Sequence, residues 1–255
     1  MQRVDLLLVE LGLAPSRTAA QALIAAGRVS VDDGGQLRDI GKASQKLPAD
    51  SRFVIVPDEA DRYVSRGGLK MAGALAQAGL QIDGWTALDV GQSTGGFSDC
   101  LLQAGARRVV GVDVGHDQLA PRLAADPRIV AFEGVNARAL DHAALLAAND
   151  GAPFDLMVCD VSFISLALVY PSALPLIRPG GYLLSLVKPQ FEVGREGLGH
   201  GGIVRDAQLY GGVEQKISAL VAELGFQRLG WFDSPIKGGD GNREFFIFAQ
   251  RHPAI

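Results

Sequence analysis

The sequence predicts an α/β fold, with a mostly parallel sheet of the doubly wound kind behind a smaller N-terminal unit. Apolar runs of strand length alternate with helical stretches through most of the chain. A glycine-rich turn follows the first of these runs, between Leu88 and Phe97. A polar segment near residue 60 separates this part of the chain from what precedes it.

Seven apolar runs are expected to form the sheet. The first five are interleaved with helical stretches, which favours parallel strands joined by crossover helices. The last two are joined by the turn-rich segment SPIKGGDGNR, which has no room for a helix, so they should close the sheet as an antiparallel hairpin. The seven runs are Thr86–Val90, Val109–Val114, Ile129–Phe132, Leu156–Cys159, Tyr182–Val187, Leu229–Phe232 and Phe245–Phe248.

The N-terminal unit, residues 1–60, combines short helices with short strands. Its apolar residues recur at helical spacing on either side of Pro15, which predicts two short helices. Ser16 can cap the second helix. Two β-type segments follow, 29–31 and 53–56, with the turn signal Asp-Gly-Gly between them.

Residues 61–67 are expected to be a polar linker and hinge, and 68–255 to form the larger domain. The chain of 255 residues, with 48% hydrophobic and 20% charged residues, has material for a sizeable core. Because the net charge is −4, any RNA must be held by a local basic patch. Cys100 and Cys159 lie in apolar runs and are expected to be buried thiols. Without a signal peptide or an unbroken apolar span, we expect a cytoplasmic protein that does not enter the membrane.

The stretch LDVGQSTGGF predicts a cofactor pocket. Its strand ends at Asp89 and runs into a loop that holds Gly91, Gly95 and Gly96, where the backbone can approach a nucleotide closely. Asp113 ends the next apolar run about 20 residues later, where doubly wound folds place a carboxylate on ribose hydroxyls. A turn whose glycines only permit close packing is the structural alternative.

Charge decides which cofactor is favoured. A carboxylate such as Asp89 at the mouth of the loop would repel the pyrophosphate of a dinucleotide such as NAD. The same carboxylate would attract the sulfonium and ammonium groups of S-adenosylmethionine. The sequence therefore favours the methyl donor.

Several motifs carry a resemblance to a known family. RVDLLLVELGLAPSRTAAQALIAAGRVSV resembles the S-four-type RNA-binding fold, which implies an RNA partner. Together with YVSRGGLK, VCDVSFISL, LVKPQFEVGR, GGIVRD and GNREFFIF, nearly the whole chain resembles the TlyA family of ribosomal RNA 2′-O-methyltransferases. The resemblance implies a Rossmann-like class I methyltransferase domain after a small α+β domain of the S-four type. Two departures are Gln92, in place of a small residue, and Val135, in place of a polar residue.

The resemblance implies a catalytic tetrad of Lys70, Asp160, Lys188 and Glu244. Asp160 and Lys188 end neighbouring strands at the edge where parallel sheets bind ligands, although each alone could be a charge where the chain emerges into water. A ribose hydroxyl is a poor nucleophile. Lys188 would either remove its proton during attack on the methyl group or stay charged and stabilise the alkoxide.

The other predicted site residues bind cofactor or RNA. Arg17 and Arg28 flank a predicted helix, where periodicity leaves both phosphate binding and solvated charge open. The glycine-rich segment 189–206 is expected to be a mobile loop over the site. The histidines lack metal-ligand spacing, so we expect no metal. The predicted cofactor-binding residues are Asp89, Gly91, Ser93, Thr94, Gly95, Gly96, Phe97, Asp113, Val114, Asn136 and Asp160, and the predicted RNA-binding residues are Arg3, Arg17, Arg28, Arg66, Arg195 and Arg205.

Three functions from different classes are considered. The first is S-adenosylmethionine-dependent 2′-O-methylation of rRNA or of ribosomal subunits, with cytidine implied by the resemblance. The second is a non-catalytic RNA-binding assembly factor, which would be expected to lose the tetrad. The third is a membrane-active haemolysin, a label that some relatives carry, but the sequence offers no membrane segment. The intact tetrad favours catalysis, and the sequence makes no prediction about the oligomeric state.

Overall fold

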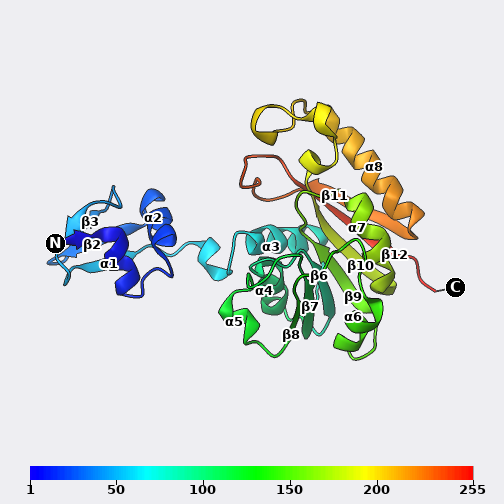
Figure 1. The fold of residues 1–255 in the computed structure, drawn as a ribbon, viewed down its shortest axis with the longest axis horizontal. Helices are drawn as coiled ribbons and strands as arrows, with labels where there is room; N and C mark the ends of the chain where they lie inside the picture. Colours follow the sequence, from blue (N-terminus) through cyan, green and yellow to red (C-terminus); the bar gives the residue numbers. More distant parts are fainter. Residues whose placement is uncertain (255) are drawn as a thin grey trace. The chain divides into compact units, whose positions relative to one another are not determined.

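The computed structural model describes residues 1–254, the side chains of residues 59 and 60 excepted (Figure 1). The chain divides into two compact units, Met1–Asp61 and Arg62–Ile255. Each unit has a hydrophobic core of its own.

The N-terminal unit packs two helices against a small antiparallel sheet. Its strands run in the order β3-β2-β5, and a separate pair is formed by β1 and β4. Val4 and Leu8 of the first helix, Ala20 of the second and Val29 of the sheet are fully buried together. The elements are β1 (Gln2–Arg3), α1 (Val4–Glu10), α2 (Arg17–Ala25), β2 (Val29–Asp33), β3 (Gln36–Asp39), β4 (Lys46–Leu47) and β5 (Arg52–Ile55).

Both predicted helices of this unit are confirmed, and so is the cap on the second, because Ser16 Oγ accepts a hydrogen bond from the Ala19 amide at 3.2 Å. The expected turn at residues 33–35 is also confirmed. It joins β2 to an additional strand, β3, since Asp33 pairs with Gln36 across a tight turn whose two glycines have positive φ. β3 escaped prediction because its four residues are all exposed, which leaves no apolar alternation to read.

The C-terminal unit is built on a seven-stranded sheet with the order β11-β12-β10-β9-β6-β7-β8. The five strands from β6 to β10 are parallel neighbours, and β12 lies antiparallel to both β10 and β11. The seven predicted strands and the terminal antiparallel pair are therefore confirmed. The strands are β6 (Thr86–Val90), β7 (Arg108–Val112), β8 (Ile129–Phe132), β9 (Phe154–Cys159), β10 (Ile177–Val187), β11 (Phe226–Asp233) and β12 (Phe245–Arg251).

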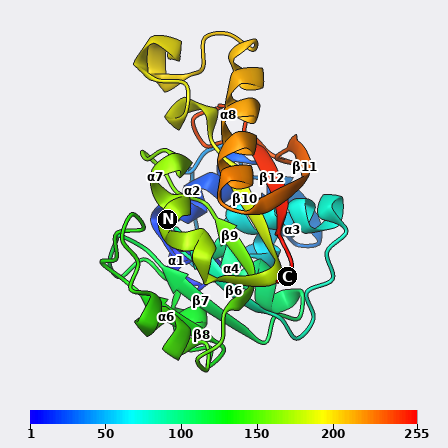
Figure 2. The ribbon, with the colours of Figure 1, turned by 90° about the vertical axis from the view of Figure 1, so that its right-hand side faces the viewer.

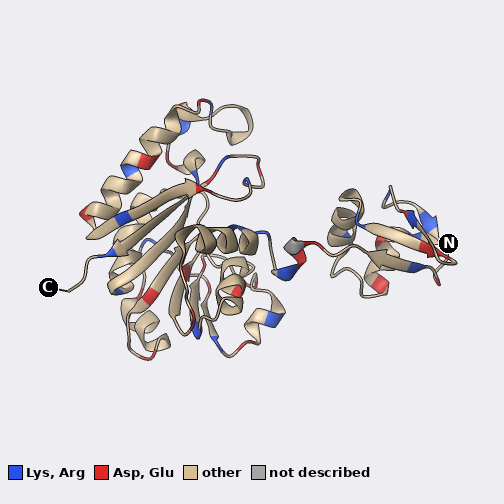
Figure 3. Ribbon diagram, turned by 180° about the vertical axis from the view of Figure 1, so that it is seen from behind, with Lys and Arg blue, Asp and Glu red and all other residues tan. Residues whose placement is uncertain are grey.

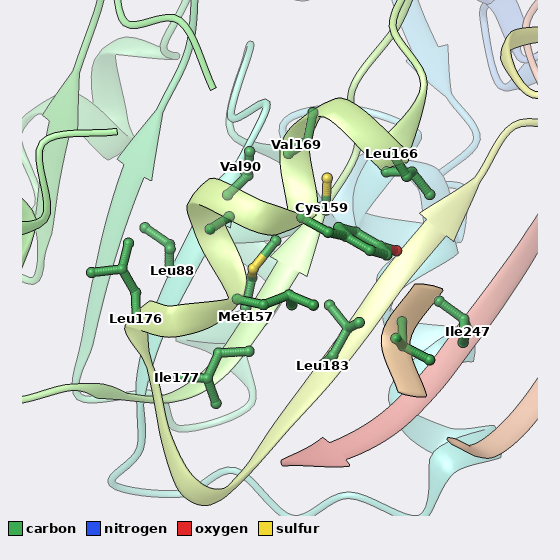
Figure 4. Close-up of a cluster of buried hydrophobic side chains, with 14 of the residues drawn as sticks. Leu88, Val90, Met157, Cys159, Leu166, Val169, Leu176, Ile177, Leu183 and Ile247 are labelled. Atoms are coloured by element: carbon green, nitrogen blue, oxygen red, sulfur yellow. The ribbon is translucent and has the colours of Figure 1, made fainter. Parts of the chain in front are cut away.

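Helices cover both faces of this sheet, and Figure 2 shows α7 and α3 on opposite sides of the strands. Successive strand residues alternate between two cores, as a two-residue side-chain period requires. Leu88 and Val90 join the core under α6, α7 and α8 (Figure 4), whereas Ala87 joins the core under α3, α4 and α5. The helices are α3 (Gly67–Ala78), α4 (Gly96–Gln103), α5 (Pro121–Ala124), α6 (His142–Ala148), α7 (Leu166–Ala173) and α8 (Leu209–Glu223).

The segment predicted to be a hinge differs from that expectation. From Tyr63 onward the chain packs on the C-terminal unit. Tyr63 is 8% exposed and lies so close to Gly68 that a Cβ there would be 2.2 Å from its ring. The Val64 amide donates to Asp99 Oδ2 at 2.8 Å. The buried ring of Tyr63 and the hydrogen bond from the Val64 amide hold this part of the segment against the C-terminal unit. The prediction of a polar linker over all of 61–67 is therefore incorrect.

The segment 189–206 contains only short 3₁₀ turns and an isolated bridge between Leu198 and Val204, in keeping with the irregular loop expected there. Its start is anchored by Glu192, which accepts hydrogen bonds from the Leu166 amide at 2.8 Å and from Lys216 Nζ at 2.8 Å. Its mobility stays a prediction. Cys100 and Cys159 are buried free thiols, as expected. Among the described residues, no helix is both long and apolar enough to cross a bilayer.

Gln92, the departure noted in the sequence, fills space that is open because residue 111 is glycine. A Cβ on Gly111 would lie 2.1 Å from Gln92 Cδ, and Gln92 is 5% exposed. We predict that Gly111→Ala lowers the free energy of unfolding by about 1 to 3 kcal/mol through overpacking. Gln92→Ala in the same chain should recover part of this loss, as measured by denaturant unfolding. Equal stability of the single and double variants would contradict the assignment.

Candidate active site

The carboxyl ends of β6, β9 and β10 open onto three adjoining cavities in the C-terminal unit. The first, the Asp113 cavity, has a volume of about 520 Å³. The second, the glycine-loop cavity of about 310 Å³, lies against residues 91–97. The third, the Phe191 cavity of about 490 Å³, lies against residues 188–202. Ser162 lines all three, so the cavities form one connected site.

Glycines shape the wall that the first two cavities share. Gly91 has φ +84°, and a Cβ there would lie 2.5 Å from the carbonyl oxygen of Asp160. A Cβ on Gly96 would lie 2.2 Å from Ser65 Oγ. Only glycine permits these approaches, which bring the loop backbone to the cavity surface. Gly95, with φ +91°, instead allows close packing of Leu123 and lines none of the three cavities.

The Asp113 cavity combines a carboxylate with apolar side chains. Asp113 accepts hydrogen bonds from the Ser93 amide at 2.8 Å and the Gly115 amide at 2.7 Å, which fix its carboxylate at the cavity wall. Val114 is 74% exposed there, and Asn136 lies on the same wall. A carboxylate beside an exposed apolar surface suits a nucleoside, with ribose hydroxyls on one side and a base on the other.

Asp89 lies beneath the glycine loop instead of at its mouth, which corrects the sequence-based expectation. It is fully buried, lines none of the three cavities and accepts a hydrogen bond from Ser98 Oγ at 2.6 Å. The physical reason is that α4 starts directly over β6, so Ser98 reaches back to the carboxylate. Its Oδ1 has no hydrogen-bond partner among the described residues. Burial raises the pKa of Asp89 to about 7.

The four residues of the predicted tetrad meet at the junction of the cavities as two ion pairs. Lys70 Nζ lies 2.6 Å from Glu244 Oε2, and Lys188 Nζ lies 2.5 Å from Asp160 Oδ1. Lys188 also donates to Ser162 Oγ at 2.8 Å. Burial raises the pKa of Glu244, and the hydrogen bond from Lys70 offsets part of that effect.

Sheet register explains why these residues meet. Asp160 directly follows β9, Lys188 follows β10 and Glu244 precedes β12. Because Val187 pairs with Phe245 across the antiparallel strands β10 and β12, the next residues outward are Lys188 and Glu244. Lys70 comes from the first turns of α3, which the glycines at its start allow to approach the loop closely.

Phe163 is a site residue that sequence reasoning missed. It is 91% exposed, has φ +63° and lines both the Asp113 and the Phe191 cavities. Its ring lies 5.2 Å from that of Phe191. An exposed aromatic ring on a left-handed backbone is a costly arrangement, typical of functional positions. Nothing in the spacing signals it, because a left-handed backbone at a bulky residue has no sequence pattern. Other lining residues that were not among the predicted site residues include Ser65, Gly67, Gln118, Val135, Arg138, Ser162, Gln190, Lys237 and Asp240.

The predicted RNA-binding arginines divide into four groups. Arg66 lines the glycine-loop cavity and donates to the Lys237 carbonyl at 3.1 Å. Arg195 and Arg205 lie in the segment 189–206 but line none of the three cavities. Arg28 is turned inward, because its guanidinium pairs with Asp61 and with the Val56 carbonyl, which leaves its side chain 15% exposed. We therefore withdraw Arg28 as an RNA ligand.

The remaining pair, Arg3 and Arg17, both contact Asp5 within the N-terminal unit.

Within residues 1–254, no three histidine, cysteine or acidic side chains are grouped so that they could hold a metal ion.

Comparison with known proteins places this site in a family. The FtsJ-like methyltransferase family matches residues 63–251, and the S4 domain matches residues 2–34. The chain is 41% identical over 246 residues to the 16S/23S rRNA (cytidine-2′-O)-methyltransferase TlyA of Mycobacterium tuberculosis, covering 96% of this chain and 88% of that protein. The chain belongs to the TlyA family. The FtsJ-like match spans all three cavities, and the S4 match ends just after β2, in the turn to β3.

Two further relatives agree with this placement. Hemolysin A of Brachyspira hyodysenteriae is 36% identical over 234 residues, covering 92% of this chain and 93% of that protein. A solved structure from Streptococcus thermophilus has a TM-score of 0.75 at 37% identity and covers 98% of this chain and 88% of its own. The TlyA family thus includes proteins named for two different activities, and the chemistry must be argued from the site.

The buried Asp89 predicts a pH dependence of stability. Because its pKa is raised to about 7, the folded protein keeps a proton there that the unfolded chain releases above about pH 4. The folded state then binds more protons than the unfolded state between about pH 4 and 7, so the contribution of this group falls as pH rises through that window.

We expect Asp89→Asn, which cannot ionise, to have a flatter profile of unfolding free energy from pH 5 to 8 than the wild type. The variant should gain relative stability toward pH 8, in denaturant titrations at a series of pH values. Parallel profiles for the two proteins would contradict the raised pKa.

Proposed function

We propose that this chain is an S-adenosylmethionine-dependent ribose 2′-O-methyltransferase that acts on cytidines of rRNA. The observation that carries the proposal is the pair of lysine–carboxylate ion pairs where the glycine-lined cavities meet the open Phe191 cavity. The family supports methyl transfer, and the name of the mycobacterial relative supplies the substrate class.

The cofactor fits the two cavities that share the glycine wall. Asp113 would accept hydrogen bonds from the ribose hydroxyls, while Val114 and Asn136 would contact the adenine. The amino-acid part would lie in the glycine-loop cavity, against the backbone from Gly91 to Gly96. When bound, S-adenosylmethionine supplies an electrophilic methyl group on a positively charged sulfur.

Lys188 is the residue best placed to act on the ribose hydroxyl. Asp160 and Ser162 fix its ammonium group at the junction of the cavities. As an ammonium group, Lys188 would stabilise negative charge that develops on the 2′ oxygen. As a neutral amine, it would remove the hydroxyl proton during attack on the methyl group. Lys70 itself is held by Glu244, and both residues line the Phe191 cavity together with Lys188.

Phe163 suits the base of the target nucleotide. RNA is modified or read most readily where an unstacked base can rest on an aromatic side chain. Phe163 offers such a ring, almost fully exposed, beside both the tetrad and the cofactor cavity. A ribose whose base stacks there would present its 2′ hydroxyl near Lys188.

The distribution of unpaired cations supports an RNA-binding face at the cavities. Acidic and basic residues are both scattered over the ribbon in Figure 3, and many arginines of the C-terminal unit, such as Arg107 and Arg228, form ion pairs. Seven cations among the described residues of the C-terminal unit form no ion pair with a carboxylate. Arg62 and Arg251 lie away from the three cavities and donate to uncharged acceptors. The other five lie in segments that border the cavities and are Arg66, Arg138, Arg195, Arg205 and Lys237.

Asp113→Ala is expected to weaken S-adenosylmethionine binding by at least about tenfold, because a lost hydrogen bond to a charged group costs about 1.5 to 3 kcal/mol. Isothermal titration calorimetry of the full chain would measure the change. Val114→Ala, on the same cavity wall, should have a smaller effect. Unchanged affinity in Asp113→Ala would remove this carboxylate from the binding site.

Lys188→Ala should lower the rate of methyl transfer by about 10²- to 10⁴-fold, the range expected for a group that acts on the reacting proton. Its affinity for cofactor and for RNA should stay close to wild type, since the interaction is made mainly in the transition state. Incorporation of labelled methyl groups into rRNA and filter binding would measure both. Arg228→Ala, whose partner Glu214 lies on α8 away from the cavities, is the control. A normal rate in Lys188→Ala would overturn the tetrad mechanism.

A further inference from the structure

One carboxylate in the N-terminal unit organises two arginines. Asp5, in the first turn of α1, accepts hydrogen bonds from Arg3 Nε and Nη2, both at 2.9 Å. Arg17 Nε donates to its Oδ2 at 2.9 Å, and Gln21 Nε2 donates to the same oxygen at 2.8 Å. The carboxylate therefore joins β1, α1 and α2 at one point.

The cluster is unbalanced in charge. Asp5 is fully buried, whereas the side chains of Arg3 and Arg17 remain 35% and 52% exposed. The hydrogen bonds from Arg3 hold the pKa of this carboxyl well below its usual range, so it is ionised at neutral pH. Two guanidinium groups thus share one negative charge, and one positive charge is left over at the surface.

Some guanidinium nitrogens of the two partly exposed arginines do not contact Asp5. Each arginine uses Nε on Asp5, which fixes the plane of the guanidinium group. No described residue accepts a hydrogen bond from the two terminal nitrogens of Arg17 or from Arg3 Nη1. Because Arg3 and Arg17 contact the same oxygen, their guanidinium groups are close neighbours. Such a pair matches an anion with several acceptor oxygens, and a phosphodiester is one.

We propose that Asp5 is a positioning residue that holds Arg3 and Arg17 together as a clamp for RNA backbone phosphates. The inference rests on the proposed function, because it assumes that RNA is the substrate. The N-terminal unit would then contact RNA through the fixed positions of two guanidinium groups, and not through its net charge.

This clamp differs from an exposed ion pair of the same unit. Arg38 pairs one-to-one with Asp33, and both side chains are more than half exposed. An exposed pair of this kind contributes little and does not fix its partners. Asp5, in contrast, is buried, so the core fixes its position. Its hydrogen bonds in turn fix the positions of the two arginines.

The proposal makes a prediction opposite to that of simple charge attraction. Asp5→Asn raises the net charge of the protein by one, which on its own would strengthen RNA binding. If Asp5 acts by positioning, the variant should instead bind about tenfold more weakly, as expected when charge-assisted contacts are lost. The slope of log affinity against log salt should also fall by between about one and two, since each phosphate contact contributes about 0.7 to 0.9.

Equilibrium binding of the full chain to transcribed 16S and 23S rRNA at several salt concentrations would test this. Asp33→Asn, which frees an exposed arginine elsewhere in the unit, is the matched control and should bind like the wild type. Adding Asp5→Asn to the Arg3→Gln/Arg17→Gln chain should cause no further loss. A further loss there would show that Asp5 acts only through the fold, and would overturn the proposal.

A second variant covers the case in which Asp5→Asn fails to fold. Arg17→Lys keeps the charge of a half-exposed side chain but cannot reproduce the fixed guanidinium plane. We expect it to lose nearly as much RNA affinity as Arg17→Gln. Wild-type affinity in Arg17→Lys would show that charge alone matters and would also overturn the clamp. The wild-type chain is assayed in parallel for methyl transfer to rRNA, so that a failure of the proposed function is recognised separately from a failure of the clamp.

Discussion

The close approach of the glycine loop to its neighbours is the constraint on which the site depends. Gly91 meets the backbone of Asp160, and Gly96 meets Ser65, at distances that exclude any side chain. These contacts bring β6, β9 and the start of α3 to one edge of the sheet. The same approach sets Asp160 and Lys70 beside the cavity that the loop lines. Cofactor site and tetrad are therefore consequences of one packing arrangement.

Buried carboxylates perform different tasks in the two units, and their surroundings explain the difference. Among the described residues, Asp89 has only Ser98 as a hydrogen-bond donor, so burial favours its neutral form. Asp5 is equally buried but receives hydrogen bonds from two guanidinium groups, so it stays ionised. Glu244 lies between these cases, because burial raises its pKa while Lys70 opposes the change. In each case the partner decides the charge.

Much of the C-terminal fold could be predicted because buried parallel strands read as apolar runs and glycines mark the loop between them. Lys188 and Glu244 lie close together because of the register between β10 and β12. This register cannot be read from either apolar run alone. Asp89 was placed at the mouth of the loop because its strand ends there, but the return of Ser98 from α4 covers it. The N-terminal unit was harder to predict, since short exposed strands such as β3 show no alternation of apolar and polar residues. Phe163 could not be found, because its exposure and its positive φ are properties of the folded chain alone.

The position of the methyl group on the RNA tests the central claim most directly. A 2′-O-methyl group removes the hydroxyl that attacks the adjacent phosphodiester in alkali, so that linkage survives hydrolysis. Unmodified 16S and 23S rRNA would be incubated with the protein and S-adenosylmethionine labelled in the methyl group, then hydrolysed in alkali and separated. The account predicts that the label appears in alkali-stable dinucleotides that begin with cytidine. Label in mononucleotides would place the methyl group on a base and contradict the account.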